Sequence, residues 1–264
     1  MLTGRDSDIF WSAASCRRFQ FVTSKRLQVN ALQNERHVSV LTRASEVNYR
    51  AMPKFLDLES WSRRELFDFF IGYAQPYFNV CVQMDVTEFL NFVRARSLKV
   101  SIAIHYFALR AANEIEPFRY RLKDGKVLVF DVIHGGTTVL MPNESFAYAY
   151  FEYHPDFKVF AAGMGQAVDE LRAGSGALKP TMRDDVIYHT TLPWIPFTSF
   201  MHARTPGRGE SIPRIVFGKF TPQGERMTMP ISVEVHHALM DGLHVGRFLN
   251  RLEEALAKPQ EFLQ

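Results

Sequence analysis

The sequence predicts an α+β fold in which helices are layered around one large β-sheet. Segments that alternate apolar and polar residues are interspersed with helix-like segments, but strands and helices do not follow one another in strict βαβ order. The chain has 264 residues, of which 47% are hydrophobic and 23 are phenylalanine. This length allows one large domain or two small ones with a substantial, aromatic-rich core.

Capping and turn residues locate the elements of the first half. Ser62, with Glu65 three residues later, predicts the start of a helix. Asp85 or Thr87 begins a second helix, and Asp124-Gly125 is a typical hairpin turn. The predicted elements are a helix over 60–70, a strand over 78–85, helices over 87–93 and 101–112, and strands over 119–122, 127–132, 137–141 and 146–151.

The second half begins with an amphipathic helix over 155–171, followed by a loop at Gly174-Ser-Gly. Apolar, β-branched runs then predict strands, and the last periodic segment predicts a closing helix. These elements cover 186–192, 214–220 and 227–235 as strands and 245–256 as the helix. We find no internal repeat.

The composition argues against several functional classes. A net charge of +3 is too small to indicate nucleic-acid binding. No apolar run approaches the roughly 18–20 residues that span a bilayer. Cys16 and Cys81 lie far apart and offer neither a disulfide framework nor a metal-binding spacing. We therefore expect a cytoplasmic protein that binds no metal, no nucleic acid and no membrane.

The first 51 residues differ from the rest of the chain. They contain eight Lys/Arg against four Asp/Glu, are rich in Ser, Asn and Arg, and lack sustained periodicity. We expect residues 1–51 to be a disordered N-terminal extension and residues 52–264 to form the catalytic domain. A true translation start at Met52 would make the extension an artefact, and an organelle transit peptide is the alternative that we favour less.

The most informative segment is Ser232-Val-Glu-Val-His-His-Ala-Leu-Met-Asp-Gly242. Its alternation predicts a strand that ends before Asp241-Gly242. His236 and His237 are adjacent on this strand, so their side chains must face opposite sides. The pair therefore does not hold one metal ion, and a single imidazole is left to act as a general base near neutral pH.

The other candidate chemistries lack support. The chain has no G-x-S-x-G elbow, no P-loop and no H-E-x-x-H helix, and Gly163-Met-Gly165 lacks the third glycine of a dinucleotide-binding loop. The cysteines have no activating neighbours, and His244 is expected only to pack near the turn. The remaining histidines have no neighbouring residues at a catalytic or metal-binding spacing. They are His37, His105, His134, His154 and His189. Direct general-base catalysis on an alcohol is what remains.

The segment His236–Phe248 resembles the active-site signature of the chloramphenicol acetyltransferases. Its H-H-x-x-x-D-G core also occurs in peptide-synthetase condensation domains and, in a related form, in dihydrolipoyl acyltransferases. Three further segments resemble this family in order along the chain, and these are Trp61–Phe70, Thr190–Trp194 and Leu249–Leu252. The resemblance covers roughly residues 54–256. It implies a CoA-dependent acyltransferase fold, a two-layer sandwich with a large mixed β-sheet flanked by helices, and acetyl-CoA as the co-substrate.

The resemblance assigns roles to four residues. His237 matches the general base, whose second ring nitrogen bonds to its own backbone carbonyl in the family. Asp241 matches a carboxylate that pairs with Arg63 to hold the site together. Thr190 stands where a serine commonly stabilises the tetrahedral oxyanion, and it keeps the hydroxyl. Without the resemblance, Arg63 would be a solvated helix charge and Thr190 an ordinary strand residue.

The expected acceptor pocket differs from the family pattern at three positions. Phe69 and Phe200 match its apolar walls, and Phe70 stands where a tyrosine is frequent. Val216 replaces a threonine and His202 an apolar residue. A pocket with altered hydrogen-bonding groups favours weaker chloramphenicol binding or another alcohol.

The resemblance also implies a coenzyme site and an assembly. Lys219 matches a lysine near the coenzyme phosphates, and Phe220 replaces an aromatic hydroxyl beside it. The family forms homotrimers, which would place His237 on one subunit and Phe69 on its neighbour. Two alternatives stay open, namely the same fold acetylating another small alcohol or amine, and a non-catalytic descendant that binds CoA or an apolar ligand. A dihydrolipoyl acyltransferase core is less favoured because no lipoyl domain or Ala/Pro-rich linker precedes the catalytic region.

Overall fold

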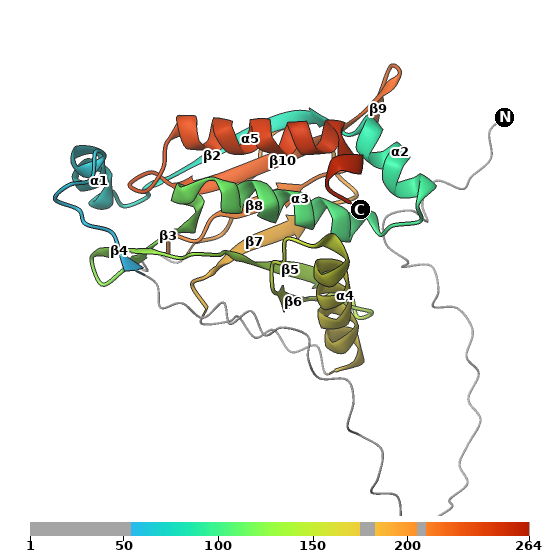
Figure 1. Cartoon of the computed structure of the whole chain (residues 1–264), viewed down its shortest axis with the longest axis horizontal. Helices are drawn as coiled ribbons and strands as arrows, with labels where there is room; N and C mark the ends of the chain where they lie inside the picture. The colour runs from blue at the N-terminus through green and yellow to red at the C-terminus, as the bar shows by residue number, and fades with distance from the viewer. Residues whose placement is uncertain (1–53, 175–182, 205–209, 264) are drawn as a thin grey trace, which may run out of the picture. The chain divides into compact units, whose positions relative to one another are not determined.

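The computed structural model describes residues 54–174, 183–204 and 210–263 (Figure 1). The extension expected over residues 1–51 lies outside the described residues, as does most of the loop expected after Gly174.

The central feature is a mixed sheet of seven strands in the order β2-β10-β8-β7-β5-β6, with β9 paired to β10. The β5–β7 and β7–β8 pairs are parallel, and the others are antiparallel. The strands are β2 (Tyr77–Asp85), β5 (His134–Leu140), β6 (Phe146–Phe151), β7 (Val186–Thr191), β8 (Arg214–Phe217), β9 (Thr221–Gln223) and β10 (Arg226–His236). The predicted mixed sheet is confirmed.

Helices cover one face of this sheet, where α5 contacts β2, α3 contacts β5 and α4 contacts β6 (Figure 1). The helical elements are α1 (Arg64–Ile71), α2 (Thr87–Ala95), α3 (Val100–Glu114), η1 (Glu116–Arg119), α4 (Phe157–Ala173), α5 (Gly242–Ala257) and η2 (Pro259–Glu261). The helix α3 is apolar on nearly every side and is buried along most of its length, as expected for a central helix. The two-layer arrangement is therefore also confirmed.

A small second sheet joins β1 (Lys54–Phe55), β4 (Lys126–Val129) and β3 (Tyr120–Lys123). The predicted hairpin turn is present between β3 and β4. Asp124 and Gly125 both have positive φ, +48° and +73°, which two-residue hairpin turns of this kind require.

The predicted helices and strands are confirmed to within a few residues, with two kinds of exception. Ser62 does not cap α1, because the helix starts one residue later and Arg63 is its N-cap without a side-chain hydrogen bond. The short strands β1 and β9 were not predicted. Two or three residues, one of them Pro222 in β9, are too few to show alternation.

Strand register defines which residues share the sheet face that the helices leave uncovered. His189 contacts His105 of α3, so His189 and its neighbours in register, Ile215 and Val233, face the helices. Side chains alternate along a strand, so the next row lies on the other face. That row comprises Thr190, Val216, Ser232 and Cys81, and the following one comprises Tyr188, Arg214, Glu234 and Asn79.

Candidate active site

The end of β10 separates the two adjacent histidines. His236 is buried against Tyr77, with ring centroids 5.1 Å apart, and burial lowers the pKa of His236 to about 4. The backbone N–H of His237 donates to the Pro76 carbonyl at 2.6 Å, which fixes the chain just beyond the strand. His237 is partly exposed. His236 is thus a packing residue, and His237 is the imidazole that a substrate can reach.

Two aromatic side chains hold the ring of His237. Phe70 of α1 stacks on it with centroids 3.8 Å apart and planes 8° from parallel, and Phe78 of β2 contacts it at 4.6 Å. Nδ1 of His237 is buried and has no hydrogen-bond partner among the described residues, so the expected bond to its own carbonyl is not formed. Burial of Nδ1 leaves Nε2 as the nitrogen that can face an acceptor.

Arg63 joins α1 to the loop after β10. Its guanidinium forms an ion pair with Asp241, and its Nη2 donates to the His237 carbonyl at 3.4 Å. Burial raises the pKa of Asp241, but the nearby charges of Arg63 and His244 outweigh this effect and lower it below its ordinary value. Asp241 is therefore a carboxylate at neutral pH, and Arg63 links it to the peptide of His237.

Asp241 has a second role that sequence reasoning missed. It is the N-cap of α5, and its side chain accepts from the Leu243 N–H at 3.0 Å. His244 completes a capping box, because its Nδ1 accepts from the Asp241 N–H at 3.1 Å. The D-x-x-H spacing was the available signal, with histidine in the position that Glu or Gln usually occupies.

Thr190 does not lie beside His237 within one chain. Through Val216, Thr190 is in register with Ser232, and Ser232 precedes the end of β10 at His236 by four residues. Those four residues alone span roughly 13 Å along the strand, and two strand spacings across the sheet add to the separation. Among the described residues the Thr190 hydroxyl has no hydrogen-bond partner, and the residue is half-exposed.

The predicted pocket residues fall into two separate groups. Phe69 is 60% exposed on α1 and contacts Phe70 at 5.0 Å. Phe69 thus lies beside a ring that stacks on His237 of its own chain, whereas the resemblance implied that a neighbouring subunit supplies Phe69. Phe70, expected in the pocket, instead packs directly on His237. The second group, Val216, Phe200 and His202, lies on or over the sheet face that carries Thr190.

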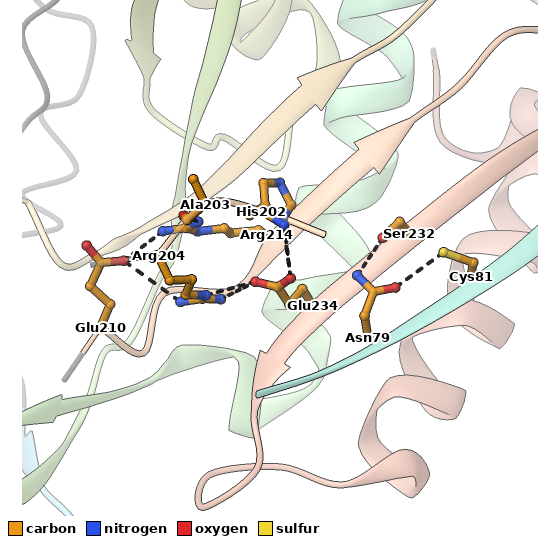
Figure 2. A network of polar contacts seen from close by, with 9 residues as sticks. All are labelled: Asn79, Cys81, His202, Ala203, Arg204, Glu210, Arg214, Ser232 and Glu234. Carbon is orange, nitrogen blue, oxygen red and sulfur yellow. Dashed lines mark hydrogen bonds and ion pairs between the residues drawn. The ribbon is translucent and has the colours of Figure 1, made fainter. Parts of the chain in front are cut away.

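The second group includes contacts that the sequence did not reveal. Phe200 and His202 form an edge-to-face ring pair at 4.8 Å, and Val216 is fully buried on this face. His202 lies against the buried Glu234 of β10, which also pairs with Arg204 (Figure 2). An acidic residue in the middle of an otherwise buried strand was the only sequence signal for this cluster.

The residues expected near the coenzyme follow β8. Lys219 is exposed and its backbone N–H donates to the Ile195 carbonyl at 3.1 Å, while Phe220 is half-buried. In the described part of the chain, no three His, Cys, Asp or Glu side chains are grouped as metal ligands. None of the described helices combines the length and apolar character needed to cross a membrane.

Comparison with known proteins agrees with this geometry. A sequence profile of the family described as "Chloramphenicol acetyltransferase" matches residues 50–253, which include Arg63, Thr190, His237 and Asp241. The chain belongs to the chloramphenicol acetyltransferase family. A chloramphenicol acetyltransferase of Klebsiella sp is 32% identical over 200 residues, covering 75% of this chain and 91% of the relative. The chain is therefore a chloramphenicol O-acetyltransferase-like acyltransferase.

Solved structures show the same fold. A chloramphenicol acetyltransferase structure matches with a TM-score of 0.71 and 27% identity, covering 78% of this chain and 100% of that one. A dihydrolipoamide acetyltransferase of Azotobacter vinelandii matches with a TM-score of 0.55 at 18% identity, covering 76% of this chain and 88% of that one. The second match shows likeness of fold alone. The predicted CoA-dependent acyltransferase fold is confirmed.

Proposed function

We propose that this protein transfers the acetyl group of acetyl-CoA to a hydroxyl of chloramphenicol or of a closely related alcohol, with His237 as the general base. Nε2 of His237 takes the proton of the acceptor hydroxyl while its oxygen attacks the thioester carbonyl. The Thr190 hydroxyl donates to the resulting oxyanion. The C–S bond then breaks, and the departing CoA thiolate takes the proton from the imidazolium.

The observation that carries this proposal is the way the chain holds His237. Its ring lies flat against Phe70, its carbonyl accepts from Arg63, and its Nδ1 is buried. These contacts leave one orientation in which Nε2 is the nitrogen free to accept a proton. A base fixed before the substrate binds has no reorganisation to undergo when the reaction starts.

The same reaction requires a second copy of the chain. A base and an oxyanion donor must both come within about 3 Å of atoms of one tetrahedral centre. The register separation of Thr190 from His237 is far larger than their two short side chains can span. We therefore propose the homotrimer expected for the family, with His237, Phe69 and Phe70 from one subunit facing Thr190, Val216, Phe200 and His202 of its neighbour.

The remaining assignments follow from this arrangement. Lys219 offers an exposed ammonium for the coenzyme phosphates, and Phe220 offers an aromatic surface. We propose that residues 52–264 form the catalytic domain and that the enzyme works in the cytoplasm. Phe70 and Val216 lack the hydroxyls of the family pattern, which favours an acceptor preference different from that of the relatives.

Thiol release from acetyl-CoA tests the proposal. Wild-type protein should release CoA thiol in the presence of chloramphenicol or of another member of a panel of small alcohols and amines. His237→Ala should lower kcat by at least about 1000-fold while the elution volume of the assembly stays unchanged. His154→Gln, at a half-exposed loop position, is the matched control. Near-normal turnover by His237→Ala would contradict the mechanism, and release with amines alone would support the alternative acceptor class.

A further inference from the structure

Glu234 is a buried carboxylate on the sheet face that also carries Thr190 and Val216. It is 4% exposed, and Arg204 donates from Nε to its Oε1 at 2.9 Å. Burial raises the pKa of Glu234, but the contacts with His202 and Arg204 lower it to about 2, so the carboxylate is ionised at neutral pH. The proposed mechanism makes no use of this charge.

Polar contacts from the sheet hold three consecutive residues of the segment that crosses this face (Figure 2). The His202 N–H donates to Glu234 Oε2 at 3.5 Å, and Arg204 pairs with the same carboxylate. Between them, the Ala203 carbonyl accepts from Arg214 Nη1 at 2.8 Å. Arg214 also pairs with Glu210 at 2.7 Å. The side chain of His202 is thus presented from a fixed backbone.

The carboxylate also determines which nitrogen of the His202 ring carries the proton. Nδ1 is buried and lies 3.5 Å from Glu234 Oε2, with no shorter polar contact in the described part of the chain. A nitrogen lone pair facing a carboxylate is repelled, so Nδ1 carries the ring proton. Arg204 already forms an ion pair with Glu234, so this carboxylate has a positively charged partner without His202. Nε2 then carries a lone pair, and it points away from Glu234 (Figure 2).

We propose that the Glu234–His202 pair determines acceptor specificity, with Nε2 of His202 accepting a hydrogen bond from a second donor on the acceptor, a hydroxyl or amide N–H distinct from the hydroxyl that is acetylated. This inference rests on the proposed function and specifies its substrate class. The preferred acceptor is an alcohol with an additional hydrogen-bond donor, and a simple mono-alcohol of similar size is a poor substrate. An apolar side chain at position 202 would make no such distinction.

Two acceptors test this pair. Chloramphenicol carries a second hydroxyl and an amide N–H, whereas 3-(4-nitrophenyl)propan-1-ol retains the primary hydroxyl and aromatic ring but has neither donor. His202→Leu should lower kcat/KM for chloramphenicol, through a higher KM, about tenfold more than it lowers kcat/KM for the mono-alcohol. His202→Gln, whose amide oxygen reaches the position of Nε2, should retain most of the preference. Glu234→Gln should reduce the preference, and Glu253→Gln, which removes an exposed carboxylate from α5, should not.

The outcomes separate this inference from the proposed function. Equal losses on both acceptors, or no loss on chloramphenicol, for a His202→Leu protein that elutes as wild type would overturn the specificity role. Failure of His202→Gln to do better than His202→Leu would also overturn it. Absence of thiol release by the wild-type protein with every alcohol tested would contradict the proposed function itself and this inference with it.

Discussion

Phe70 lies flat against the imidazole of His237, with ring centroids 3.8 Å apart and planes 8° from parallel. The two residues are far apart in the sequence, and the contact depends on the position of α1. Arg63, the N-cap of the same helix, reaches the His237 carbonyl and Asp241. One short helix therefore fixes the ring from one side and its peptide from the other.

Shortening the stacking residue should slow the chemical step. Phe70→Leu removes the parallel ring and lets the imidazole rotate, so we expect kcat to decrease about three- to tenfold, in line with the free energy of an aromatic pair. The KM of acetyl-CoA should not change, because Lys219 and Phe220 are untouched. Steady-state thiol release measures both constants, with Phe55→Leu on the exposed β1 as control. An unchanged kcat would mean that the stack does not position the base.

Mixed assemblies should reveal whether the site is shared between subunits. His237→Ala and Thr190→Val should each be nearly inactive alone, because one lacks the base and the other the oxyanion donor. Co-expressed, the two variants should regain activity at about a quarter of the sites, where the intact His237 of one subunit meets the intact Thr190 of the next. Purified mixtures assayed for thiol release measure this recovery. No recovery from assemblies shown to contain both chains would indicate that each site lies within one chain.

Arg121 should be a large contributor to stability. Arg121 is 1% exposed, and within the described part of the chain its guanidinium donates to four backbone carbonyls, those of Phe118, Tyr120, Asp184 and Val186. Burial lowers the pKa of Arg121 to about 9. Arg121→Met leaves these carbonyls without their donors, and we expect the free energy of unfolding to decrease by about 3 kcal/mol. Urea unfolding measures the change, with the exposed Arg226→Met as the matched control. If Arg121→Met lost no more unfolding free energy than Arg226→Met, the prediction would be contradicted.

Two core histidines should make the fold sensitive to mild acid. Burial lowers the pKa of His105 to about 4 and lowers that of His189 well below its ordinary value. The unfolded chain binds these protons near pH 6.5, before the folded chain does. Their contribution to stability is complete above pH 6.5 and is lost as the pH falls towards 4, by up to about 1.4 kcal/mol per pH unit for each histidine.

His189→Leu provides the test of this acid sensitivity. The Nε2 of His189 is buried without a hydrogen-bond partner among the described residues, so leucine removes one titrating group and gives up one long contact, between Nδ1 and the Gly136 carbonyl at 3.3 Å. Between pH 6.5 and 5, the slope of the unfolding free energy against pH should decrease by about 1.4 kcal/mol per pH unit, the contribution of one bound proton. Urea midpoints at several pH values measure it, and His154→Gln serves as the matched histidine removal. An unchanged slope for His189→Leu would show that His189 does not titrate on unfolding.

Local rules explain which elements were predicted correctly. The alternation of β10 and the Asp124-Gly125 turn depend only on consecutive residues, so the strand and the hairpin could be predicted directly. Ser62 was a wrong capping prediction because the α1 start depends on Arg63, whose position is determined by distant Asp241. Glu234 gave no local sign of its partners, because Arg204 and His202 reach it across a long connection between β7 and β8.

The sequence by itself determined the α+β class, the strand that ends in two histidines, and the residue types that general-base acetyl transfer needs. Alternation and ordered motifs carry that information, since they depend only on neighbours along the chain. Only the tertiary structure decided that Phe70 stacks on His237, that Thr190 lies too far along the sheet to share a site with His237 of its own chain, and that Glu234 lies against His202. Register and packing set the distances between residues that are tens to well over a hundred positions apart, and no local pattern encodes those distances.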